Sequence, residues 1–216
     1  MKVRTRLASI IATMLLIAIT GLSGCATTGM QRSEKTGTTM KAVESDIRQA
    51  TAQVDVTSAS LDELTRPGQS DVKKAFEKYS ANVEKMDDLG KRLFEHADKM
   101  SAQGKEYFEE WRKQGNTYTN PEIQSLSEQR RSDLSAVYIK ISEASVGVKG
   151  TYKAYISDNM EIKTYLSNDL TPKGIESITP TAQKSVRDGD YLKEAVKPVL
   201  TAIDNAKVEL VRGGAK

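Results

Sequence analysis

Cysteine and histidine are almost absent from this sequence of 216 residues, which contains only Cys25 and His96. The usual zinc sites need several such ligands, so no metal site is predicted. A catalytic triad needs a histidine with partners, and His96 lies among charged residues of a predicted helix. We expect His96 to be solvated there, and we predict neither a catalytic residue nor a cofactor.

Other signatures of enzymes and of nucleic-acid binders are also missing. The sequence has no G-x-S-x-G motif and no glycine-rich phosphate loop. The acidic neighbours at 87–88 and 109–110 point to different faces of a helix, so neither pair forms a site. No run of Lys and Arg is interleaved with aromatic residues, as a nucleic-acid surface would require. We therefore expect a non-enzymatic protein without a nucleic-acid partner, and no small-molecule substrate is evident.

The small net charge of +3 comes from the first six residues, where Lys2, Arg4 and Arg6 lie. An apolar run over 7–19 and a few small residues follow, which is the layout of a secretory signal. The run is shorter than the about 20 residues of a membrane-spanning helix. We predict that residues 1–24 are a removable leader, after which acidic and basic residues balance.

Leu22, Ser23, Gly24 and Cys25 resemble the lipobox of bacterial lipoprotein precursors. In that family the cysteine sulfur receives a diacylglyceryl group, the leader is cut before the cysteine, and the new amine is acylated. The resemblance implies lipidation of Cys25, and two or more acyl chains give stable membrane anchoring. Ala26 follows, and not the Asp that resembles an inner-membrane retention signal, which favours the outer membrane facing the periplasm. An ordinary secretory signal ending near a cysteine is the alternative.

The remainder of the chain is predicted to be all-α. Apolar residues recur at steps of three and four, the a/d pattern of bundles and coiled coils, along 40–64, 72–111, 126–166 and 192–210. Short turns between such segments favour antiparallel neighbours. We predict an elongated antiparallel bundle or coiled coil of about four long helices. The expected division is leader 1–24, flexible tether 25–37, one helical domain 38–212 and flexible tail 213–216.

We call each of these rows of regularly spaced residues a seam. Several residues on the seams are unusual. Gly90 and Gly104 favour close approach of a bulky partner helix, with a hinge as the alternative. Arg130 and Asn159 either fix the register or are exposed near a bundle end. Two successive steps of four around Val148 resemble a stutter, which would locally unwind a supercoil.

The last segment carries four signals for a turn, a helix start, a break or a kink. The residues 171–174 are typical of a turn, and Pro180 is in the position that opens a helix. The sequence Asp-Gly-Asp at 188–190 is a second candidate break. Pro198 predicts a kink in the helix that follows.

Phe108, Trp111 and Tyr118 form the strongest aromatic cluster and are the candidate partner surface. The alternative is that they plug the end of the bundle, because aromatic side chains dominate core burial. A second candidate is Lys216 in a glycine-containing tail. It resembles the terminal lysine of the major outer-membrane lipoprotein (Braun type), which is joined to peptidoglycan, and this would imply cell-wall attachment.

A wider family resemblance is carried by Phe108-x-x-Trp111, Tyr118-x-Asn120, and Leu166-x-x-x-Leu170 with Ile175. These stretches resemble an uncharacterised set of bacterial lipoproteins grouped as a domain of unknown function. The resemblance implies a lipobox-bearing, highly charged, long-helical protein and carries over no catalytic residue. The turn at 171–174 departs from the pattern of such proteins.

Three functions follow as expectations, in this order. The first is a structural or scaffolding role in the envelope, through coiled-coil packing of the chain on itself or on an envelope protein. The second is a periplasmic binding or chaperone-like module for hydrophobic ligands or partner proteins, and a lipoprotein enzyme comes third. An exposed seam would indicate a partner helix, whereas seams buried within one chain would argue against self-assembly.

Cys25→Ser is expected to leave an unprocessed precursor that takes up no labelled palmitate, because the acceptor sulfur is gone. Metabolic labelling and gel mobility in bacterial cells measure both effects. Normal maturation of the variant would contradict lipidation at this residue.

Overall fold

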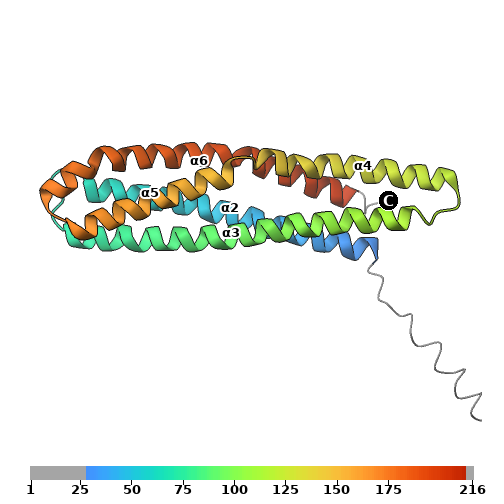
Figure 1. Cartoon of the computed structure of the whole chain (residues 1–216), viewed down its shortest axis with the longest axis horizontal. Coiled ribbons are helices and arrows are strands. Elements are labelled where there is room, and N and C mark those ends of the chain that lie inside the picture. Colours follow the sequence, from blue (N-terminus) through green and yellow to red (C-terminus); the bar gives the residue numbers. More distant parts are fainter. Residues whose placement is uncertain (1–27, 213–216) are drawn as a thin grey trace, which may run out of the picture.

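The computed structural model describes residues 28–212. They form the helices α2 (Gly29–Thr65), α3 (Val72–Gly115), α4 (Pro121–Ala144), α5 (Val148–Asn168) and α6 (Pro172–Arg212) (Figure 1). The described part contains no strand. The prediction of an all-α, elongated helical bundle is confirmed.

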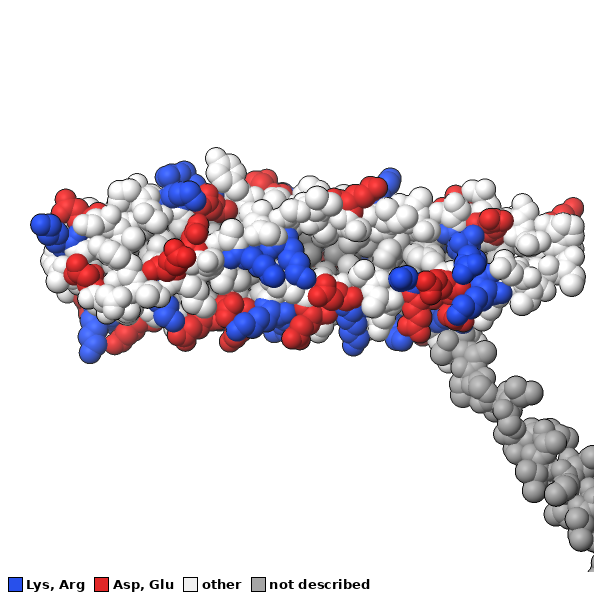
Figure 2. Space-filling model, in the orientation of Figure 1, with Lys and Arg blue, Asp and Glu red and all other residues white. Residues whose placement is uncertain are grey.

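The helices form four antiparallel segments, which we call legs (Figure 1). The first leg is α2, the second is α3, the third is α4 continued by α5, and the fourth is α6. The leg made of α4 and α5 packs on α3 and α6, as does α2. The start of α2, the α3–α4 turn and the end of α6 share one end of the rod. With 44 residues, α3 is about 66 Å long. Acidic and basic side chains alternate along the face in Figure 2.

The predicted seams of the first and last legs are buried along their whole length. In α2 these are Met40, Val43, Ile47, Ala50, Val54, Thr57, Leu61 and Leu64. In α6 they are Leu192, Val196, Val199, Ile203, Ala206 and Leu210. These seams face the other legs of the same chain, so neither is left for a partner helix.

Two expectations about where helices begin, and one about a buried seam residue, are wrong. Residues 29–37 belong to α2 and not to a tether, because Thr28 and Gln31 form a capping box that starts the helix there. The final helix begins at Pro172 and not at Pro180. Leu126 is 71% exposed and not on a buried seam, because α4 begins beyond the end of α6.

The Asp-Gly-Asp sequence at 188–190 does not interrupt α6. Gly189 lies against α2 and α5, and a Cβ added there would be about 3.0 Å from Val54 and 3.1 Å from the Tyr155 hydroxyl. The packing of other legs on this glycine keeps the helix continuous.

The third leg is broken where the stutter was predicted. α4 ends at Ala144, α5 begins at Val148, and Gly147 between them has a left-handed φ of 82°. Val146 is 81% exposed at the break. The extra residues of the stutter thus form a turn between two helices, and the helix does not continue through them with a locally unwound supercoil.

The two polar seam residues have different roles. Asn159 is fully buried, accepts a hydrogen bond from the Tyr79 hydroxyl at 3.0 Å, and donates to Ser185 at 2.9 Å. Since these bonds join three legs, Asn159 fixes their register. Arg130 is half-buried near the end of the rod and pairs with Glu209 of α6.

The two seam glycines of α3 provide close approach, as expected. A Cβ on Gly104 would lie 2.3 Å from the Tyr138 ring, and one on Gly90 would lie 2.6 Å from the Tyr152 ring. Each tyrosine also donates a hydrogen bond to the carbonyl four residues before its glycine, that of Met100 at 2.6 Å or Met86 at 3.1 Å. We call these two arrangements the tyrosine–glycine contacts.

Gly104→Ala is expected to lower the free energy of unfolding by about 1–3 kcal/mol, because the new methyl group displaces the Tyr138 ring. Gly150→Ala is the matched control, since nothing lies within 4 Å of its added Cβ. The control should raise stability by about 0.5–1 kcal/mol through helix propensity. Denaturant unfolding measures both, and equal effects would contradict the close packing.

Candidate functional site

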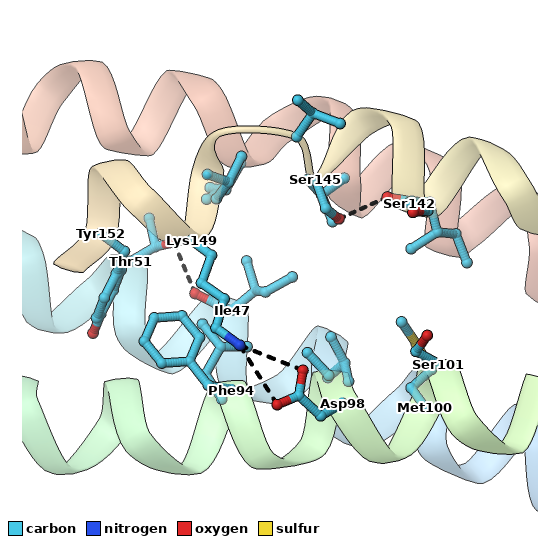
Figure 3. Close-up of a pocket in the computed structure, with 18 of the residues that line it drawn as sticks. Ile47, Thr51, Phe94, Asp98, Met100, Ser101, Ser142, Ser145, Lys149 and Tyr152 are labelled. Carbon is cyan, nitrogen blue, oxygen red and sulfur yellow. Dashed lines mark hydrogen bonds and ion pairs between the residues drawn. The ribbon is translucent and has the colours of Figure 1, made fainter.

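An open cavity of about 330 Å³ lies at the break between α4 and α5 (Figure 3). Its size is at the lower end of the range of small-molecule pockets, about 300–1,000 Å³. All four legs contribute to its lining. It is therefore a hollow in the bundle interior that opens sideways.

The cavity lies between the two tyrosine–glycine contacts, and Tyr138 and Tyr152 both line it. These contacts hold α4 and α5 against α3 on either side. Between them the chain turns outward at 145–147, above the opening in Figure 3. Across the gap α3 presents the small side chain of Ala97. At this level the third leg has the turn 145–147 in place of a helix.

The walls and floor of the cavity are mostly apolar, with a few hydroxyl side chains from Thr51, Ser101, Ser142 and Ser145. Phe94 and Tyr152 pack edge to face with ring centroids 5.7 Å apart. The aliphatic residues that line the cavity from α2 and α6 are Val43, Ile47, Val54, Leu192, Val196 and Val199. Such a surface favours an apolar ligand, because its burial removes apolar area from water.

The mouth of the cavity carries a cation. Lys149 reaches from α5 towards Asp98 on α3, with Nζ 3.4 Å from the nearer carboxylate oxygen (Figure 3). The same Nζ lies 5.1 Å from the centre of the Phe94 ring. About half of the Lys149 side chain is exposed. Because the ion pair is long and solvated, it is weak, and the ammonium group can turn to another anion.

Lys193, the other lysine at the cavity, is already bound. Its Nζ lies 2.5 Å from Asp55 and 2.8 Å from Asp190. Hydrogen bonds to Asp190 and Asp55 raise the pKa of Lys193. It therefore stays charged and engaged with these carboxylates.

The two tyrosines at the cavity do not have the chemistry of a catalytic pair. Burial raises the pKa of Tyr138 to about 12, and burial also raises the pKa of Tyr152. Both phenols are therefore protonated donors at neutral pH, and each is engaged with a backbone carbonyl. Their arrangement suits packing and support of the cavity walls.

The predicted aromatic cluster is brought together only in part. Phe108 packs edge to face on Tyr107 and on Tyr138, at 5.1 Å and 5.6 Å between centroids. Trp111 is half-buried and donates to Ser127 at 3.0 Å. Tyr118 lies in the α3–α4 turn and is 43% exposed. Phe108 and Trp111 thus pack at the interhelical core, and Tyr118 stands apart from them.

His96 is not the solvated residue that we expected. Its Nδ1 lies 2.5 Å from Asp46 Oδ2, and Arg92 Nε donates to Asp46 Oδ1 at 2.8 Å. The Asp46 side chain is only 5% exposed. A buried carboxylate on α2 therefore holds two side chains of α3, a pairing for which the sequence gives no signal.

Two predicted sites fall outside the described residues. These are the lipobox residues Leu22, Ser23, Gly24 and Cys25, and the candidate attachment residue Lys216. Within 28–212 no group of three or more His, Cys, Asp or Glu side chains could hold a metal ion. No helix in this range is long and apolar enough to cross a membrane.

Comparisons with family models, with curated proteins and with solved structures found no match to this chain. The resemblance to uncharacterised lipoproteins therefore stays a prediction. The cavity itself was not predicted from the sequence. The stutter predicted around Val148 lies at the same position along the third leg.

Proposed function

We propose that this protein is a non-enzymatic lipoprotein of the bacterial cell envelope that binds a hydrophobic ligand in the cavity at the α4–α5 break. In this proposal acyl chains on Cys25 anchor it to the outer membrane, and the rod faces the periplasm. The observation that carries the binding function is the apolar, laterally open cavity of about 330 Å³.

The lining suggests a single-chain amphiphile with an anionic head group. Aliphatic walls suit a hydrocarbon chain, and Lys149 at the mouth suits a carboxylate or phosphate. Burial contributes about 0.8 kcal/mol per methylene, so a chain of about ten methylenes would gain roughly 8 kcal/mol before the costs of association. Binding in the micromolar to millimolar range is expected once those costs are included.

A structural or scaffolding role through coiled-coil packing is the second candidate. The length of the rod favours it as a spacer. The buried seams of α2 and α6 argue against self-association along the bundle, because no long apolar stripe of these helices is left for another helix. A scaffold would have to act through its ends.

Ala97→Phe is expected to abolish binding of an uncharged naphthylamine dye, because the ring would occupy the cavity. Titration of the protein with N-phenyl-1-naphthylamine, followed by displacement with laurate, measures the site. The wild-type protein should show dye fluorescence that laurate removes.

Ala136→Phe is the matched control, since Ala136 is exposed on α4 and does not line the cavity. It should bind the dye as the wild type does. Equal binding by both variants, with native circular dichroism, would contradict the cavity as the ligand site. Absence of binding to the wild-type protein would contradict the proposed function.

A further inference from the structure

One end of the rod projects beyond the rest. Lys35 near the start of α2 pairs with Glu106 of α3 at 3.7 Å, and Arg32 donates to Gln114 at 2.8 Å. The beginning of α2 is therefore level with the last turns of α3. The α3–α4 turn continues past this level and past the end of α6 (Figure 1). We call the segment 115–126, made of this turn and the first residues of α4, the tip.

The tip exposes apolar side chains that nothing in the described part covers. The exposed fractions are 43% for Tyr118, 48% for Ile123 and 71% for Leu126. Ile123 and Leu126 are three residues apart on α4, so they share one face. Met30 at the start of α2 is 73% exposed at the same end of the rod. Figure 2 shows few charged side chains over this end.

The residue proposed to carry the acyl chains is at this same end. Cys25 precedes Gly29 by four residues, which can span at most about 14 Å. Trp111 donates to Ser127, so the first six residues of α4 rise about 9 Å beyond the level of Trp111. The reach of Cys25 from the start of α2 is therefore long enough for the acyl chains and the tip to meet one plane.

We propose that the tip is a second membrane contact, resting on the surface of the bilayer that holds the acyl chains of Cys25. This inference rests on the lipidation in the proposed function. Tyrosine and aliphatic side chains suit the membrane interface, where apolar bodies and polar groups meet.

Contact at the tip orients the whole rod. The α2–α3 and α5–α6 turns lie at the opposite end (Figure 1). A protein held at Cys25 and at the tip stands upright, with those turns extending into the periplasm. The cavity is then held above the membrane, and not pressed against it.

The test uses the full-length lipidated protein in vesicles of phosphatidylethanolamine and phosphatidylglycerol with brominated acyl chains. Ile123→Cys carries an NBD fluorophore, since the sulfur of lipidated Cys25 does not react. Ile139→Cys is the matched control, because Ile139 is 51% exposed on α4 away from the tip. Brominated lipid should quench NBD at 123 and leave it unquenched at 139. Adding Leu126→Asp should remove the quenching at 123.

The remaining outcomes separate this inference from the anchor. Co-flotation with vesicles without quenching at 123 would overturn the tip contact and leave lipidation intact. Failure to float would overturn the anchor itself. Equal quenching at both positions would mean that the rod lies flat on the membrane, and would overturn the contact through the tip. A blue-shifted emission at 123 in detergent that disappears on dilution would assign the tip to a second copy of the chain, and would overturn the membrane contact.

Discussion

The close approach of α3 to the third leg at Gly90 and Gly104 is the constraint on which the rest of the bundle depends. The two glycines are two heptads apart, and so are Tyr152 and Tyr138, which lie over them. Each ring occupies the space of a missing Cβ, so α4 and α5 cannot slide along α3. The stutter between the two tyrosines is therefore confined to the turn at 145–147, and the cavity opens beside it.

This arrangement connects packing with the proposed ligand. Protein interiors contain few voids larger than a water molecule, because unfilled space loses contacts. The open cavity of about 330 Å³ instead leaves apolar side chains facing water, so an apolar ligand that displaces this water would be favoured. The weak Lys149–Asp98 pair at the mouth can exchange partners at little cost, which suits an anionic head group.

Much of the fold could be predicted because heptad periodicity is a local property of the chain. The buried seams of α2 and α6, the close approach at Gly90 and Gly104 and the position of the stutter all follow from residue spacing. The start of α6 at Pro172 and its continuity through Gly189 could not be predicted, since contacts from other legs override local turn signals there. The binding site was missed for a similar reason, because a hollow depends on what four legs fail to fill.

The sequence by itself determined that the chain is a helical rod, and it predicts the lipidated end through the lipobox at Cys25. Both conclusions rest on the spacing of residues that are close together in the chain, so neither requires a contact between distant residues. Only the tertiary structure decided how the legs align. That alignment pairs His96 and Arg92 with buried Asp46, gathers the cavity lining from all four legs, and leaves Ile123 and Leu126 exposed at the end of the rod that holds the α3–α4 turn. These features require residues far apart in the chain to reach the same level of the rod, and side-chain packing between legs sets that level.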